Sequence, residues 1–530
     1  MSPLWGTHRH DEEDVDRGEN DSPAGNRTRR EQEADERTRL LPRENHNAYL
    51  SPDDPAVSPY NLWSVRALRS FSIVLLFISL IWWVLLLVSI FVSPPGMNNR
   101  GSGFFDFAYT TLTISNLLIA LIFFAVPSRP MTVWACLLSV LLAVNLFVVL
   151  GVGRLRIEEG WVGIASVIWA TVISLYLVAQ TRVVAKGKRE EEERLTGREE
   201  TRRSLGEWIA VLLQVIIMAV TVIVALLLMS TLSLRAKDAT LPAPGKKFYV
   251  DSNKYQVHLN CIGEKNTTAE RPIVTVLLEA GEMPVEHTLQ GWVDDAYQHG
   301  TIERYCYWDR PGIGWSDNAP SPHSAGMAAD ALSEALAEAE EDGPWVLVSA
   351  GVGGIYSRIF SSRNNRDVHG IMLIDALHED LLYKLGKPSR GFLLWLRGIL
   401  SPLGIDRLAG AIFKGRTRED RISGKRAYQG GKFIKAELQE SLVADSMTRS
   451  EISGARTIQS GSTPLVIISS GKEVRKSSTW AEKQEDLTKL THNLVAWDIV
   501  KGAPHEVWET VEGRQILEKR LKELTERVNK

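Results

Sequence analysis

The stretch Pro344-Trp-Val-Leu-Val-Ser-Ala-Gly-Val-Gly-Gly-Ile-Tyr356 decides the fold of the C-terminal half of the chain. Its apolar run from Trp345 to Val348 is typical of a fully buried strand. The small residues Ser349 to Gly354 come next, and a helical pattern of apolar side chains begins at Ile355. A strand that turns into a helix this abruptly leaves almost no room for Cβ atoms, so the turn needs small residues. The stretch therefore predicts a strand, a tight turn and a helix.

Short apolar runs that alternate with helical stretches fill the sequence from residue 245 to residue 530. This alternation is typical of an α/β domain with a mostly parallel sheet. We predict eight strands, at Lys247–Val250, Tyr255–Asn260, Ile273–Glu279, Tyr305–Asp309, Trp345–Val348, Ile371–Asp375, Leu465–Ser469 and Leu494–Ile499. The insert 377–463 contains the amphipathic segments Phe392–Leu400 and Ile405–Phe413. We interpret it as a helical cap over a pocket, and helices that lie on a membrane surface are the alternative.

The loop Asp309-Arg-Pro-Gly-Ile-Gly-Trp-Ser-Asp317 follows the fourth predicted strand, and Val274-Thr-Val-Leu-Leu-Glu-Ala-Gly281 contains the third. With the turn after Val348, these segments resemble the α/β-hydrolase superfamily, in particular lipase- and esterase-like members with a D-R-x-G-x-G-x-S-D loop. The resemblance covers residues 245–525, about half of the chain. It implies an eight-stranded, mostly parallel sheet with a helical cap. It also implies acyl transfer by a nucleophile, a base, an acid and oxyanion donors.

The nucleophile position is the first place where this chain departs from that family. The family's G-x-S-x-G turn corresponds here to residues 349–353, and Gly351 stands where the nucleophile belongs. Glycine has no hydroxyl, thiol or carboxylate, so it cannot form an acyl intermediate. Ser349 is the alternative nucleophile, although a shift of two residues along a strand moves a side chain by about 6–7 Å.

The resemblance places the catalytic base at His505, in the loop after the last predicted strand. The acid position remains open between Glu473, where the family usually carries it, and Asp375, which ends the sixth predicted strand, with Asp380 as a further option. The oxyanion donors would be the backbone N–H groups of Val352 and of Glu282 or Met283.

Three cysteines are too few for a disulfide framework or a zinc site, so the sequence predicts no metal and no cofactor. Cys261 and Cys306 lie on strands that the family fold places side by side. A disulfide and two buried thiols are both compatible with that arrangement.

Five long uncharged apolar runs precede the α/β domain, within residues 66–235. Each is long enough to cross about 30 Å of hydrocarbon as a helix, which takes roughly 20 residues. The predicted spans are 71–92, 108–126, 131–152, 161–180 and 208–234. The combination of such a region with an α/β-hydrolase-like domain resembles fungal integral membrane proteins.

The distribution of Lys and Arg predicts the orientation of these spans. The loop 181–207 carries eight Lys and Arg residues, while the loops 93–107 and 153–160 carry few. Basic loops remain in the cytosol. With five spans, the N-terminus and the loop 181–207 are therefore predicted to be cytosolic, and the domain 245–530 to lie on the luminal or extracellular side. The sequon at Asn266 is then a predicted glycosylation site.

Residues 1–65 are rich in charged residues and poor in apolar ones, which predicts a disordered cytosolic tail. Within the tail, Glu36-Arg-Thr-Arg-Leu40-Leu41 resembles an acidic dileucine sorting signal, which a cytosolic adaptor reads. This resemblance favours the membrane of a vacuole or endosome, and mitochondrial and endoplasmic reticulum membranes remain alternatives.

Three functions agree with these observations. The first is a pseudo-hydrolase that binds an apolar ligand or a protein partner in its capped pocket. The second is an active ester or lipid hydrolase that uses Ser349. The third is a transporter or channel element in which the hydrolase fold is a regulator. The net charge of −3 predicts no nucleic-acid partner, and the lipid bilayer is the one partner that all three share.

Overall fold

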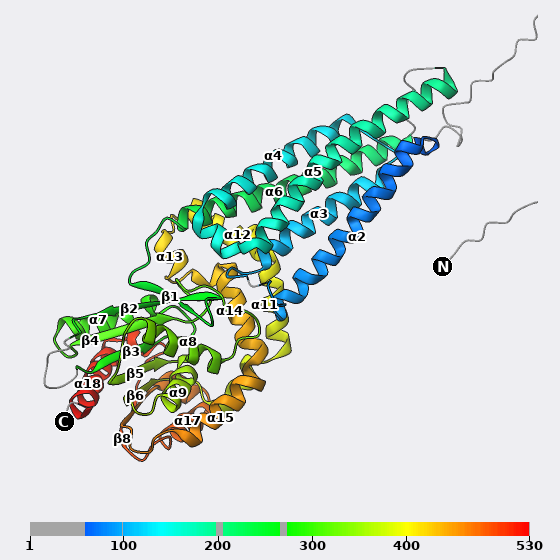
Figure 1. The fold of residues 1–530 in the computed structure, drawn as a ribbon. Helices are drawn as coiled ribbons and strands as arrows, with labels where there is room; N and C mark the ends of the chain where they lie inside the picture. The colour runs from blue at the N-terminus through cyan, green and yellow to red at the C-terminus, as the bar shows by residue number, and fades with distance from the viewer. Residues whose placement is uncertain (1–58, 98, 198–204, 266–272, 529–530) are drawn as a thin grey trace, which may run out of the picture. The chain divides into compact units, whose positions relative to one another are not determined.

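The computed structural model describes residues 59–97, 99–197, 205–265 and 273–528 (Figure 1). Residues 58–191 and 202–530 form one compact unit, which contains both the helix bundle and the sheet domain. A second unit comprises residues 1–57 and 192–201, of which the structure describes 192–197 as the end of a helix. The sorting motif at Glu36, Leu40 and Leu41 and the sequon at Asn266 lie outside the described residues.

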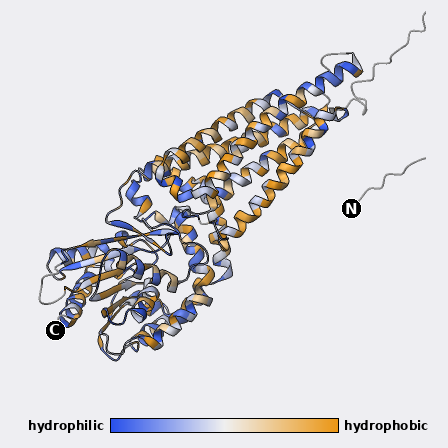
Figure 2. Ribbon diagram, in the orientation of Figure 1, coloured by the Kyte–Doolittle hydropathy of each residue, from blue (hydrophilic) through white to orange (hydrophobic). Residues whose placement is uncertain are grey.

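Five long apolar helices form a bundle, as the five predicted spans require, and each is long and apolar enough to cross a membrane. They are α2 (Trp63–Phe91), α3 (Phe104–Ile122), α4 (Arg129–Gly151), α5 (Gly153–Thr196) and α6 (Leu205–Asp238). Most residues of these helices are hydrophobic (Figure 2), and many of their large apolar side chains are exposed. In water such a surface would be costly, and in lipid it is the expected one.

The bundle helices extend beyond the predicted spans, and the added turns carry ionised side chains. Asp106 lies in the first turn of α3, Glu158 and Glu159 lie in the second turn of α5, and Arg235 lies in the last turn of α6. Arg235 contacts Glu158 at 3.0 Å and Glu159 at 2.5 Å. The spans were predicted without charged residues because hydropathy falls at these positions. α3 and α6 continue through these positions, whereas α5 has a kink at Gly160, directly after Glu158 and Glu159. Arg235 pairs with both glutamates, which offsets the cost of burying these charges.

The sheet has eight strands in the order β1-β2-β4-β3-β5-β6-β7-β8, which is the strand order of the α/β-hydrolase fold. β1 and β2 pair antiparallel, β2 pairs antiparallel with β4, and every other neighbouring pair is parallel, so the sheet is mixed. β1 begins seven residues after α6 ends. The strands are β1 (Lys246–Val250), β2 (Tyr255–Ile262), β3 (Thr275–Glu279), β4 (Arg304–Asp309), β5 (Trp345–Ala350), β6 (Val368–Ile374), β7 (Leu465–Ser470) and β8 (Leu494–Val500).

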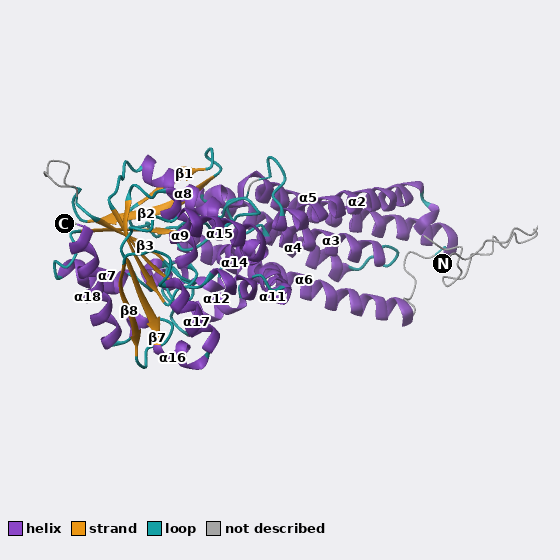
Figure 3. Ribbon diagram, turned by 90° about the horizontal axis from the view of Figure 1, so that it is seen from below, coloured by secondary structure: helices purple, strands orange, loops and turns teal. Residues whose placement is uncertain are grey.

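Helices cover both faces of this sheet (Figure 3). One face packs against α8 (Ala325–Glu338), α9 (Gly353–Arg363), α15 (Arg449–Ile458) and α17 (Ser478–Leu487). The other face packs against α7 (Gln290–Gln298) and α18 (Val511–Val528). Burial on both faces explains why β3, β5 and β7 each contain a continuous apolar run, at 276–278, 345–348 and 465–468.

The insert between β6 and β7 is helical and contacts the bundle. It contains α10 (Leu382–Leu385), α11 (Pro388–Leu400), α12 (Ile405–Phe413), α13 (Arg418–Ile422) and α14 (Gly431–Val443). α11 packs against α3, and α12 packs against α6. At Gly398 of α11, a Cβ atom would lie 2.0 Å from the ring of Phe104, so only glycine allows this approach.

The turn between β5 and α9 has the predicted form. Gly351 adopts φ +49°, in the left-handed region that glycine enters without strain. A Cβ atom at Gly353 would lie 2.2 Å from the carbonyl oxygen of Ala280 at the end of β3. Small residues are therefore needed here because α9 begins directly against the neighbouring strand.

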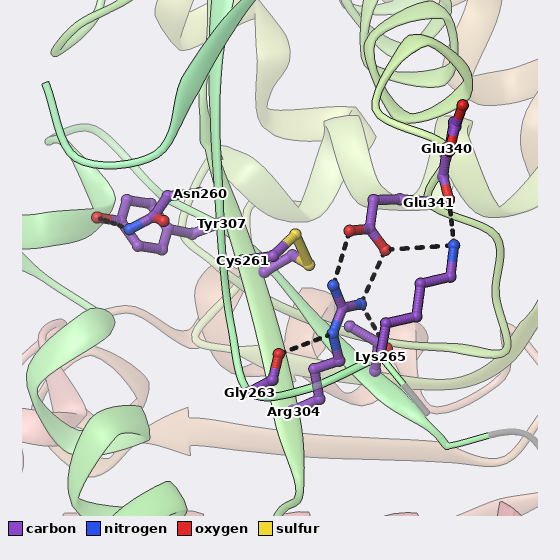
Figure 4. The surroundings of a disulfide bond; sticks show 10 residues. Asn260, Cys261, Gly263, Lys265, Arg304, Tyr307, Glu340 and Glu341 are labelled. Carbon is purple, nitrogen blue, oxygen red and sulfur yellow. Dashed lines mark hydrogen bonds and ion pairs between the residues drawn. A yellow bond between two sulfur atoms is a disulfide. The ribbon is translucent and has the colours of Figure 1, made fainter. Parts of the chain in front are cut away.

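The Cys261–Cys306 pair, which the sequence left open, is a disulfide between the neighbouring strands β2 and β4 (Figure 4). Beside it, the guanidinium of Arg304 donates to both carboxylate oxygens of Glu341, at 2.7 and 2.9 Å. Cys261, Cys306 and Glu341 lie close together, as metal ligands would. Because the two sulfur atoms are bonded to each other, neither cysteine is a thiolate that could bind a metal ion.

Candidate active site

The loops after β6 and β8 bring Asp375 and His505 together. His505 Nδ1 lies 2.6 Å from Asp375 Oδ2. The Asp375 carboxylate is fully buried, and its other oxygen accepts from the backbone N–H of Ser470 at 3.0 Å and from Trp480 Nε1 at 2.9 Å. The arrangement is that of a base and its orienting acid.

The other two acid positions considered from the sequence lie elsewhere. Glu473 is in the first turn of α16 (Gly471–Lys476), where its carboxylate is 3.5 Å from Lys476. Asp380 forms an ion pair with Lys483 at 2.9 Å. The structure therefore brings Asp375, and neither Glu473 nor Asp380, to His505.

A second carboxylate, that of Glu282, faces the other side of the His505 ring. Glu282 Oε2 lies 3.5 Å from His505 Nε2. A Cβ atom built on Gly351 would lie 2.7 and 2.9 Å from the two Glu282 carboxylate oxygens. The side chain of Glu282 thus occupies the space above the turn, between the glycine and the imidazole. That is the place where a nucleophile would act.

The two carboxylates determine the charge of the imidazole. Burial alone would lower the pKa of His505, but the hydrogen bonds to Asp375 and Glu282 and the charges of both raise it to about 10. Partial desolvation of this half-exposed side chain would raise the pKa of Glu282, but the hydrogen bond and charge of His505, together with the residue's own backbone N–H, outweigh it and lower the pKa. At neutral pH His505 is therefore an imidazolium beside the Glu282 carboxylate. An imidazolium cannot accept a proton from a nucleophile.

Arg310 fixes the loop that carries Glu282. Its guanidinium donates to the carbonyl oxygens of Ala280 and Gly281 at 2.6 and 2.7 Å and to Glu279 at 2.9 Å. Glu440 of the cap helix α14 also contacts Arg310, at 3.3 Å. These bonds hold the end of β3 and the following turn in one position, so Glu282 is presented to His505 from a rigid support.

The remaining candidates lie close to the turn but are not joined to His505. Ser349 is buried, and its hydroxyl lies 2.8 Å from that of Ser357 in α9. The structure thus does not bring Ser349 to the imidazole. Val352 is the N-cap residue of α9, and its role as an oxyanion donor stays a prediction. The N–H of Glu282, the other candidate donor, faces its own carboxylate.

The sequence suggested a role only for the backbone of Glu282, and the position of its side chain was missed. The available signal was a charged residue directly after Gly281, in the turn that the resemblance places beside Gly351. A second missed residue is Arg310, which the sequence showed only as part of a loop motif.

Residues 36–261 match the model of a protein family described as a region of unknown function (DUF2417). An uncharacterized protein of Schizosaccharomyces pombe is 35% identical over 529 residues, which cover 93% of this chain and 97% of that protein. An uncharacterized vacuolar membrane protein of Saccharomyces cerevisiae is 31% identical over 316 residues, which cover 50% of this chain and 48% of that protein. Among solved structures, the Cif epoxide hydrolase of Acinetobacter nosocomialis is 13% identical, with a TM-score of 0.41 over 57% of this chain and 96% of that chain.

Proposed function

Since this chain belongs to the family of the Schizosaccharomyces pombe protein that it matches along almost its whole length, we propose that it is a multi-pass protein of the vacuolar membrane whose α/β-hydrolase domain binds a ligand without hydrolysing it. One observation carries the proposal. The Glu282 carboxylate stands over Gly351, within 2.7 Å of the point where a nucleophile's Cβ atom would begin. The family's nucleophile is therefore missing at Gly351, and the Glu282 carboxylate occupies the space beside that position.

The charge of the site supports the same function. Acyl transfer needs a neutral imidazole beside a hydroxyl, and here the imidazole is held as a cation between two carboxylates. The side chain of Glu282 is 56% exposed, so its carboxylate is accessible from solvent. A ligand that donates a hydrogen bond or carries a positive charge fits this site better than the purely apolar ligand expected from the sequence.

The purified full-length protein should therefore not react with a fluorophosphonate probe, and it should hydrolyse a simple ester no faster than buffer does. Labelling is read by gel fluorescence, with an active serine esterase in the same detergent as the positive control. Labelling of the wild type that disappears in Ser349→Ala would overturn the proposal, because it would identify Ser349 as a working nucleophile.

A carboxylate nucleophile is the second candidate function, favoured by the 3.5 Å between Glu282 Oε2 and His505 Nε2. The carboxylate would attack a carbon of an epoxide, and the opened oxygen would take a proton from the imidazolium. Incubation with styrene oxide separates the two functions. A stable ester raises the mass of the Glu282 peptide only if this candidate is correct, and Glu282→Gln is the control.

We also propose that the hydrolase domain lies on the luminal side and the N-terminal tail in the cytosol. The basic loop 181–207 supports this orientation, and so does the Cys261–Cys306 disulfide, since disulfides persist in oxidising compartments. A cytosolic adaptor bound at Glu36, Leu40 and Leu41 would direct the protein to the vacuole.

Glycosidase treatment should increase the mobility of the wild-type protein on a gel and leave that of Asn266→Gln unchanged. The reason is that Asn266 begins an Asn-Thr-Thr sequon, which is glycosylated only in the lumen. The sequon at Asn26 is the internal control, because the proposed cytosolic tail receives no glycan. A glycan on Asn26 would reverse the orientation.

A further inference from the structure

A cavity of about 110 Å³ lies where the cap meets the bundle, well above the roughly 10–15 Å³ that one water molecule needs. Its apolar side comes from bundle helices, with Phe105 of α3 and Leu228 and Leu232 of α6. Its other side comes from the cap and from the loop 309–317. The cavity is separate from the Gly351 site, since none of Gly351, Glu282 and His505 lines it.

Basic side chains dominate the polar lining of this cavity. It contains five basic residues, Arg154, Arg235, Arg407, Arg421 and Lys432, and two carboxylates, Glu158 and Asp238. Arg235 also pairs with Glu159, which does not line the cavity. When Glu159 is counted with the two lining carboxylates, the five basic residues leave an excess of two positive charges. A positive excess in a partly enclosed cavity attracts an anion strongly, because little water screens it.

Two polar groups in the lining have unused binding capacity. Lys432 Nζ donates to the carbonyl oxygen of Gly314 at 2.9 Å, and the structure records no ion pair for it among the described residues. Burial lowers the pKa of Lys432 to about 8, because the charges of Glu158 and Asp317, which raise it, are opposed by those of Lys247 and Arg154. The buried ammonium would therefore gain from an anion. Thr231 is 4% exposed, and its hydroxyl has no hydrogen-bond partner within the part of the chain that the structure describes.

The cap helices beside the cavity expose large apolar side chains. They are Phe392, Leu393, Leu396 and Leu400 on α11 and Ile405, Ile412 and Phe413 on α12, with Phe413 82% exposed. α11 packs against α3 and α12 against α6, and both of those bundle helices are membrane spans by length and composition. Amphipathic helices in this position insert their apolar faces into the boundary between headgroups and acyl chains. The cavity is thus next to lipid.

We propose that this cavity binds the phosphate of an anionic phospholipid, whose acyl chains remain in the bilayer that α11 and α12 enter. The basic lining, the ammonium of Lys432 and the unpartnered hydroxyl of Thr231 would contact the phosphate. The apolar side chains of the two cap helices would pack against the acyl chains. This site does not depend on whether the hydrolase domain is catalytic.

The test uses the full-length protein, purified in a neutral detergent and freed of lipid. Its thermal unfolding is followed during titration with dioleoylphosphatidylglycerol. Dioleoylglycerol has the same chains without the phosphate, and glycerol 3-phosphate has the phosphate without the chains. We expect saturable stabilisation by the phospholipid, which weakens with added salt, and little response to the other two compounds.

Lys432→Met should weaken the apparent affinity for the phospholipid about tenfold, because a hydrogen bond to a charged group is lost. Lys414→Met, which removes an exposed charge just after α12, is the matched control and should bind like the wild type. Thr231→Val serves if Lys432→Met does not fold, because it deletes a hydroxyl that has no hydrogen-bond partner among the described residues. Wild-type affinity in both cavity variants, or equal stabilisation by dioleoylglycerol, would overturn the proposal. Full stabilisation by glycerol 3-phosphate would overturn it as well.

Discussion

The double variant Gly351→Ser, Glu282→Ala should gain fluorophosphonate labelling that the wild-type protein lacks. The serine hydroxyl would replace the missing nucleophile, and removal of Glu282 would free the space that its carboxylate occupies. The pKa of His505 would also fall, because one of the two carboxylates that raise it is lost. The base could then be neutral at pH 7 and accept the serine proton. Gel fluorescence at increasing probe concentration measures the gain.

One single variant and one control double variant separate the effect of the added hydroxyl from that of removing Glu282. Gly351→Ser alone should stay almost unlabelled, because the Glu282 carboxylate still pairs with His505. Gly351→Ala with Glu282→Ala carries the same strain at φ +49° without a hydroxyl, so it is the matched control for stability and should never label. Each change at Gly351 should cost roughly 1 kcal/mol of stability. A double variant that folds but stays unlabelled would show that Glu282 is not what blocks the site.

Asp238→Asn should cause the largest loss of stability among the variants considered, roughly 3–5 kcal/mol. Asp238 is the last residue of α6, is 5% exposed, and pairs with Arg407 at 3.0 Å and with Arg421. Both arginines come from the cap, so the substitution would leave two buried cations without their counter-ion. Denaturant unfolding of the purified protein measures the loss.

The control for Asp238 is Asp406→Asn, which removes an exposed carboxylate from the first turn of α12 in the same cap. It should cost at most about 1 kcal/mol, through the helix dipole. Limited trypsin digestion adds a second measurement, because a cap that has left the bundle would be cleaved faster around Arg416 and Arg418. Equal stability of both variants would mean that the Asp238 pairs do not hold the cap.

The sheet could be predicted because each of its strands carries its own signal. All eight predicted strands are present, since buried parallel strands such as β5 and β7 begin with a run of four apolar residues and are bounded by turns. The turn at Gly351 was likewise visible, because only small residues fit between β5 and α9. These features depend on a few consecutive residues.

The site could be predicted only in part, because it depends on how distant loops meet. Glu473 follows β7 and Asp375 follows β6, and these neighbouring strands end at the same edge of the sheet. Which carboxylate reaches His505 is decided by the path of each loop, which the sequence does not display. Glu282 lies in the turn after β3, and Gly351 lies in the turn after β5. The Glu282 side chain lies over Gly351 because β3 and β5 pair side by side, and that contact is not visible in the sequence.

The seven residues between α6 and β1 limit the distance that the hydrolase domain can move from the membrane. Fully extended, they span at most roughly 25 Å, so even a domain that released the bundle would remain within that distance of the membrane. Such a short tether gives nearby membrane molecules a high effective concentration at the domain and gives distant soluble molecules none. A ligand that is itself held in the membrane would therefore reach the domain by lateral diffusion in two dimensions.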